Sequence, residues 1–171
     1  NIVRYNSGWG IIVYDGKYKG NLTIDNNTIT DNSTNAPNDN GGIYLVSSPN
    51  YLPNTTITVS NNTIKGPTGA HGIFDASSAA VNIENNTIEG FVDTGINVDG
   101  YGSNGLENNT INNNVITGNG VGIEIAPWTT NSYTITNNTI ASNSASGLRL
   151  LRKASYVVTD NVIARNNSAQ N

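Results

Sequence analysis

The sequence contains no cysteine and no methionine, and its only histidine is His71. Without cysteine, no disulfide framework can form and the redox compartment cannot be inferred from thiols. Charged residues make up only 12% of the chain and the formal net charge is −4, so no basic face is available for nucleic acid. The chain also lacks an apolar run of about 18 residues or more, which excludes a predicted membrane-spanning helix.

Most of the polarity comes instead from uncharged Asn, Thr, Ser and Gly. These residues fit tight turns and the solvated face of a sheet. A surface that is rich in Asn and Thr, poor in Lys and free of Cys favours an extracellular or cell-surface location.

Two short motifs alternate along the whole chain. The first is Asn-Asn-Thr-Ile or a close variant, and its copies begin at Asn26, Asn61, Asn85, Asn113, Asn137 and Asp160. The second is Gly followed by an aliphatic residue, and its copies begin at Gly10, Gly42, Gly72, Gly95, Gly122 and Gly147. Alternation at a spacing of roughly 23 to 35 residues indicates one structural coil repeated along an axis.

The residues before each Asn pair have the period of a β-strand. In Leu22-Thr23-Ile24-Asp25, apolar and polar side chains alternate, as they do before the other pairs. Because asparagine tolerates the left-handed backbone region, one Asn of each pair is predicted to bend the chain before a short Thr-Ile strand. A variable loop and the Gly-Ile strand then complete the coil.

Stacked coils would bring equivalent residues into register about 4.8 Å apart. The predicted aliphatic columns are Ile29, Ile64, Ile88, Ile116, Ile140 and Ile163, and Ile24, Val59, Ile83, Ile111, Ile135 and Val158. The predicted bend asparagines are Asn27, Asn62, Asn86, Asn114, Asn138 and Asn161, whose amides would form a hydrogen-bonded ladder.

The same motif creates Asn-x-Thr glycosylation sequences, such as those that begin at Asn26 and Asn85. We expect these asparagines to be stacked and therefore poor acceptors. Asn32 and Asn54, in variable loops, are the better candidates.

These motifs resemble those of the right-handed parallel β-helix superfamily, which includes the pectate-lyase-like folds. The resemblance covers nearly the whole chain and implies an all-β, right-handed parallel β-helix of about six coils, with three parallel sheets and an Asn-lined bend. Residues 1–171 are then a single β-helix domain. The superfamily contains lyases, hydrolases, epimerases, phage tailspikes and passive surface proteins, so the resemblance does not assign a function.

The first and last motif copies have the same phase, and neither end shows a capping helix. Solenoids usually need polar caps, because uncapped strand edges favour pairing. Two explanations fit: a segment of a longer β-helix, or a subunit that stacks end to end into a filament.

In the resembling enzymes the substrate lies along the Gly-Ile sheet. The predicted outward residues of that sheet include an aromatic group followed by a polar group, an arrangement that suits a polysaccharide or cell-surface glycan. The predicted binding residues are Tyr14, Tyr44, Phe74, Asn97, Asp99, Glu124 and Arg149, with Trp9 close by. The alternative is an ordinary solvated sheet with scattered apolar residues.

We do not expect catalysis, but a polysaccharide lyase or a glycoside hydrolase is the enzymatic alternative. A hydrolase would use Asp99 and Glu124, which lie one coil apart, with Arg149. A lyase needs a base and a cation for the uronate carboxylate. No recognisable lyase active-site sequence is present.

No cofactor is expected, although a lyase could use calcium held by Asp75 and Asp99. Arg149, Arg152 and Lys153 could also neutralise a carboxylate, and Trp128 could present an aromatic ring to a partner.

Asp75 occupies a position where other coils have an inward aliphatic residue. A buried carboxylate without partners is costly. Either His71 or a loop amide must therefore satisfy Asp75, or the strand bulges and turns it outward. In the functional alternative, His71 is the acid/base partner of Asp75.

Overall fold

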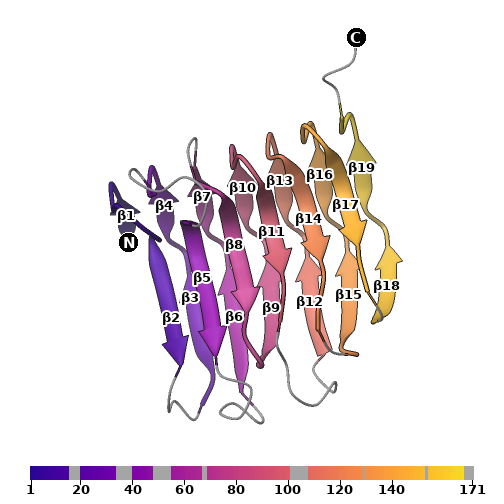
Figure 1. The fold of residues 1–171 in the computed structure, drawn as a ribbon, viewed down its shortest axis with the longest axis horizontal. Helices are drawn as coiled ribbons and strands as arrows, with labels where there is room; N and C mark the ends of the chain where they lie inside the picture. The colour runs from indigo at the N-terminus through magenta and orange to yellow at the C-terminus, as the bar shows by residue number, and fades with distance from the viewer. Residues whose placement is uncertain are drawn as a thin grey trace.

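The protein is a β-solenoid in which three parallel sheets run along one axis (Figure 1). A computed structural model describes residues 1–15, 20–33, 40–47, 55–66, 69–100, 108–128, 130–152 and 154–167. All regular secondary structure in these ranges is β-strand. The predicted fold class is therefore confirmed.

Each coil contributes one strand to each sheet. Sheet A consists, in spatial order, of β1 (Ile2–Arg4), β4 (Thr28–Thr30), β7 (Thr63–Lys65), β10 (Thr87–Glu89), β13 (Val115–Thr117), β16 (Thr139–Ala141) and β19 (Val162–Ala164). Sheet B consists of β2 (Ile11–Asp15), β5 (Gly41–Ser47), β8 (His71–Ala76), β11 (Thr94–Val98), β14 (Val121–Ile125) and β17 (Ser146–Leu150). Sheet C consists of β3 (Leu22–Asp25), β6 (Thr56–Ser60), β9 (Ala80–Glu84), β12 (Asn108–Asn112), β15 (Ser132–Thr136) and β18 (Ser155–Thr159).

The hydrophobic core consists of aliphatic columns contributed by all three sheets. The sheet A column pairs in register through Ile29, Ile64, Ile88, Ile116 and Ile140, all of which are buried. The sheet C column and the Gly-Ile column of sheet B are also in register. In the last coil, Val158 and Ile163 occupy core positions but are exposed. Both predicted columns are thus confirmed.

The two asparagines of each motif have different roles. The first has a positive φ in every copy, from 54° at Asn61 to 57° at Asn85, and is exposed. The second is stacked in every copy and is buried in all but the last, where Asn161 is half-buried; Asn86 illustrates the arrangement. The prediction of a ladder is therefore confirmed, but the sharp left-handed turn lies one residue earlier than predicted.

The ladder satisfies donors and acceptors from several coils. The backbone N–H and Nδ2 of Asn86 donate to Oδ1 of Asn114 at 2.9 and 3.1 Å, and Nδ2 also donates to the Val59 carbonyl at 2.9 Å. The Oδ1 of Asn86 accepts from the backbone N–H and Nδ2 of Asn62. Replacing such a residue would leave several buried groups without partners.

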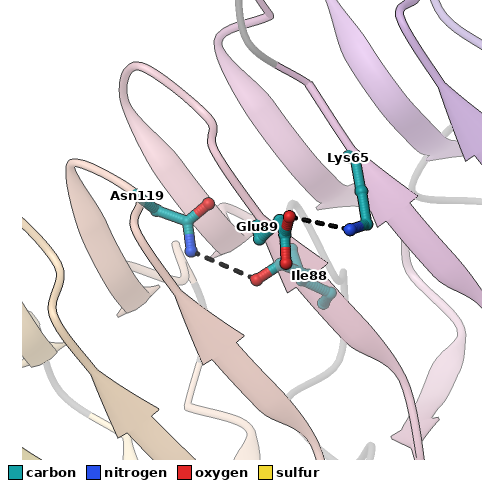
Figure 2. Close-up of polar contacts among 4 residues, drawn as sticks. All are labelled: Lys65, Ile88, Glu89 and Asn119. Carbon is teal, nitrogen blue, oxygen red and sulfur yellow. Dashed lines mark hydrogen bonds and ion pairs between the residues drawn. The ribbon is translucent and has the colours of Figure 1, made fainter.

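A second, shorter ladder that the sequence interpretation missed follows the sheet A strands. Asn119 donates its backbone N–H and Nδ2 to Oδ1 of Asn143, at 2.9 and 3.1 Å. Its Nδ2 also reaches the Ile88 carbonyl at 3.5 Å (Figure 2). On the exposed side of the same sheet, Lys65 pairs with Glu89 at 2.8 Å (Figure 2).

These two ladders correct the prediction that Asn32 is a better glycosylation candidate than the motif asparagines. Asn26 and Asn85, which begin Asn-x-Thr sequences, are the exposed turn residues and not the stacked ones. Asn32 is buried and accepts from the backbone N–H and Nδ2 of Asn6. Asn54 lies outside the described residues.

The recurring glycines of sheet B are explained by close packing. A Cβ on Gly122 would lie 2.4 Å from Cγ2 of Ile140 and 2.5 Å from the Gly147 carbonyl oxygen. These distances are shorter than real Cβ atoms allow, and Gly42, Gly72, Gly95 and Gly147 are equally crowded. The glycines therefore let sheet B approach the isoleucine column of sheet A.

Candidate functional site

The predicted outward column of sheet B exists as one straight row across six strands. Neighbouring strands pair Ile12 with Tyr44, Tyr44 with Phe74, Phe74 with Asn97, Asn97 with Glu124, and Glu124 with Arg149. We call this row the groove column, a name for these residues and not for a cleft. It runs parallel to the solenoid axis, so its aromatic and polar parts lie in successive coils.

The first part of the groove column belongs to an aromatic cluster. The Tyr44 and Phe74 rings are stacked at 5.3 Å, and the Trp9 ring lies 5.0 Å from Tyr44 and 6.3 Å from Phe74. His71 joins them, with its ring centroid 5.1 Å from Phe74. The sequence interpretation placed Trp9 near this group but did not include His71.

Tyr14 lies beside the aromatic cluster. Tyr14 pairs in register with Val46, and Val46 lies two residues beyond Tyr44 on β5. Tyr14 is 76% exposed. The aromatic group of this face is therefore formed by Trp9, Tyr44 and Phe74, with Tyr14 at its margin.

The second part of the groove column is ionic. Arg149 Nη1 donates to Glu124 Oε2 at 2.7 Å, and the side chains of Glu124 and Arg149 are 19% and 42% exposed. Asn97 connects this pair to Phe74, and its Oδ1 is buried with no hydrogen-bond donor among the described residues. A ligand on this part of the sheet would meet an amide, a carboxylate and a guanidinium in sequence.

Asp99 follows β11 and stands next to the ionic part. Burial raises the pKa of its carboxyl, and the negative charge of Glu124 raises it further. The positive charge of Arg152 and the indole N–H of Trp128, which donates to Asp99, act in the opposite direction. The two predicted carboxylates are thus close enough to influence each other electrostatically.

Asp75 is buried, with 3% of its surface exposed, and remains in register with Leu45 and Val98. Its Oδ1 accepts from the backbone N–H of Ser77 at 2.9 Å and from the Ser77 hydroxyl at 2.6 Å. The strand does not turn Asp75 outward, and of the predicted alternatives the loop amide is the correct one.

His71 does not form an acid/base pair with Asp75. The two residues lie at opposite ends of β8, four residues or about 13 Å of strand apart. The Nε2 of His71 lies 3.9 Å from Oδ2 of Asp93. Because its ring packs against Phe74, His71 belongs to the aromatic cluster.

The described residues contain no group of three or more His, Asp or Glu side chains placed to hold a metal ion. Asp75 and Asp99 are on neighbouring coils, and the Asp99 backbone N–H donates to the Asp75 carbonyl at 2.9 Å. The carboxylate of Asp75, however, already accepts from Ser77. Within the same part of the chain, no helix is long and apolar enough to cross a membrane.

The sequence predicts Trp128 as a loop aromatic that could contact a partner and Arg152 as a cation that could neutralise a carboxylate, but it does not predict that both lie beside Asp99. Each residue comes shortly after a Gly-aliphatic strand, which is the sequence signal that could have placed it near the outward column of sheet B. The lengths of the turns between strand and residue are not fixed by the motif, so the sequence does not show that Trp128 and Arg152 are neighbours. The structure brings both to Asp99.

Three parallel sheets, stacked asparagines and a core of aliphatic columns define this protein as a parallel β-solenoid. Residues 50–170 match the family described as "Right handed beta helix region", and the chain belongs to that family. No curated protein and no solved structure matches the chain.

Proposed function

We propose that this protein is an extracellular or cell-surface solenoid that binds polysaccharide along the groove column. The observation that carries the proposal is the straight register of Tyr44, Phe74, Asn97, Glu124 and Arg149 on one sheet face. Successive rows are about 4.8 Å apart, a distance comparable to one sugar unit of an extended polymer. A linear glycan lying along the axis would meet a new side chain at each coil.

The chemistry of the column suits sugars. Half-buried rings at Tyr44 and Phe74 offer apolar contact to a sugar ring, while the Glu124–Arg149 pair offers donors and acceptors to hydroxyl groups. Since these groups are fixed on strands, binding would require little rearrangement of the backbone.

The test is a binding titration with a panel of soluble polysaccharides, followed in native gels that contain the glycan and by calorimetry. Tyr44→Ala and Phe74→Ala should each weaken binding roughly 2- to 10-fold, because an aromatic contact contributes about 0.5–1.5 kcal/mol. Tyr5→Ala is the matched control, since Tyr5 is an exposed tyrosine that follows a strand of sheet A. Unchanged affinity in both groove variants would refute the proposal.

A second candidate is a glycoside hydrolase that uses the same groove column. The supporting observation is that Asp99 lies close enough to Glu124 for the two charges to interact and that burial raises the pKa of the Asp99 carboxyl, since such enzymes act through two neighbouring carboxyls. Reducing-end release that is lost in both Asp99→Asn and Glu124→Gln would favour a hydrolase. Binding without any release of reducing ends would favour the passive solenoid, and a product that absorbs in the ultraviolet would instead indicate a lyase.

A further inference from the structure

Trp128 lies just after β14 and is held in place although it is exposed. Its backbone N–H donates to the Gly100 carbonyl at 3.2 Å, and its indole N–H donates to Asp99. The guanidinium carbon of Arg152 lies over the indole ring, 3.7 Å from its centroid. Despite these contacts, 58% of Trp128 is exposed. An exposed tryptophan held at its backbone, at one edge of its ring and at one face is a preorganised contact surface.

Arg152 also has donors that face solvent. It is exposed, and no ion pair within 4.0 Å joins it to any described carboxylate. Its φ of 73° is unusual for a residue other than glycine. The stacking on Trp128 therefore orients a guanidinium whose N–H groups remain available.

These residues continue the groove column beyond the ends of the strands. Asp99 follows Asn97 by two residues, Trp128 follows Glu124 by four, and Arg152 follows Arg149 by three. The three pairs lie on three consecutive coils. The rows stay parallel there, because Ala126 donates to the Val98 carbonyl and Leu151 to the Ile125 carbonyl, both at 2.8 Å. The group thus lies beside the ionic part of the column.

The local charges indicate the kind of sugar. Two carboxylates, Asp99 and Glu124, face two guanidiniums, Arg149 and Arg152. Arg149 is already paired with Glu124, and the formal net charge of the whole chain is −4. Among the described residues of this region the charges balance, so they leave no excess of positive charge to attract a polyanion.

We propose that Trp128, Arg152 and Asp99 form a shelf that binds one pyranose unit of a neutral polysaccharide. The indole stacks on the apolar face of the ring, and Arg152 and Asp99 bind its hydroxyl groups. This inference rests on the proposed glycan-binding function. It adds a second aromatic contact at the opposite end of the groove from Trp9, and it selects neutral over acidic polymers.

The chain contains only two tryptophans, which makes the test specific to each end. In Trp9→Phe, Trp128 is the only tryptophan fluorophore, and in Trp128→Phe only Trp9 remains. Both variants and the wild type are titrated with neutral hexasaccharides of glucose, mannose, galactose and N-acetylglucosamine, and with a galacturonate hexasaccharide. Affinity is measured in parallel by calorimetry, and circular dichroism verifies folding.

We expect a neutral hexasaccharide to change the fluorescence of Trp128 in Trp9→Phe. Trp128→Ala should weaken its binding roughly 10-fold, which corresponds to about 1.4 kcal/mol. Arg152→Gln should weaken binding less. The matched control is Leu151→Ala, because Leu151 is the exposed neighbour of Arg152 and has no role in the shelf. The galacturonate hexasaccharide should bind more weakly than the neutral ones.

The failures can be told apart. If no saccharide binds the wild type, the proposed function and the shelf both fail. If a saccharide binds but changes only the Trp9 signal, and Trp128→Ala binds normally, the shelf is refuted and the groove proposal survives. Preferential binding of the galacturonate hexasaccharide would refute the assignment to neutral sugars.

Discussion

Replacing Asp75 by asparagine should stabilise this protein at neutral pH. Asp75 is a carboxyl buried in a core position, and burial raises its pKa from 3.8 to about 6 despite the two hydrogen bonds from Ser77. An asparagine has nearly the same shape and can still accept both bonds through its own Oδ1. It carries no charge to desolvate at any pH.

The magnitude follows from proton linkage. In the unfolded chain the carboxyl loses its proton near pH 3.8, whereas the folded protein keeps it until about pH 6. Folding therefore becomes less favourable as pH rises through this window. A difference of about 2.2 pKa units, at 1.36 kcal/mol per unit, corresponds to about 3 kcal/mol. Below pH 3.8 both states are protonated and this contribution disappears.

The assay is urea denaturation of wild type and Asp75→Asn at intervals between pH 3.5 and 8, in which the difference between their free energies of unfolding is measured. That difference should be smallest near pH 3.5, grow through pH 4–6 and level off above pH 7 at up to about 3 kcal/mol in favour of the variant. An offset that does not change with pH, or a variant less stable than wild type at pH 7.5, would refute the reasoning.

A control of opposite sign is available at Asp25. Its pKa is lowered by hydrogen bonds from Ser60 and Asn61. The stabilisation from Asp25 is therefore present above its unfolded pKa and is lost as the pH falls. In Asp25→Asn, the difference from wild type should shrink on acidification, with the variant the less stable protein at neutral pH.

Three further substitutions test the scaffold. Asn86→Ala removes a rung of the buried ladder and should lower the free energy of unfolding by about 3 kcal/mol or more, because several buried groups lose their partners; chemical denaturation measures this loss. Gly122→Ala forces a methyl group against Ile140 and the next coil and should cost about 1–3 kcal/mol, visible as a lower melting temperature. Lys65→Gln breaks an ion pair whose side chains are 45% and 42% exposed, so thermal unfolding should change by less than about 0.5 kcal/mol.

The ladder variant and the glycine variant each have a matched control. Asn85→Gly replaces the exposed, left-handed neighbour of Asn86 by the residue best suited to that backbone, and should be nearly neutral. Gly8→Ala places a Cβ 3.6 Å from Asn40, its nearest contact apart from its chain neighbours, and should be tolerated. The packing explanation would be wrong if Gly8→Ala and Gly122→Ala destabilised equally. The ladder explanation would be wrong if Asn85→Gly cost as much as Asn86→Ala.

The groove column was predictable from sequence because it depends on two local facts. Strand period two assigns Tyr44, Phe74 and Asn97 to the outer face, and the Gly-Ile motif fixes their phase in each coil. Residues one coil apart must then be neighbours, whatever lies between them. The aromatic and ionic parts of the column follow from this register alone.

The surroundings of the column were not predictable in the same way. Trp128 and Arg152 lie beyond strand ends, where turn length and backbone conformation decide the direction of a side chain. His71 joins the aromatic cluster through a ring contact that no sequence spacing encodes. The partner of Asp75 was also ambiguous, because a loop amide and a histidine are both plausible neighbours until distances are known.

The sequence by itself determined the coil, its period and the aliphatic columns through Ile29 and Ile24, because a repeated motif can bury its apolar residues only by stacking on its own copies. Tertiary structure decided which asparagine of each pair makes the turn and which joins the ladder. The left-handed turn at Asn85 and the ladder at Asn86 depend on the next coil being in place. The requirement for glycine at Gly122 also arises only when two sheets meet, because its backbone conformation is ordinary and the space for a side chain is missing.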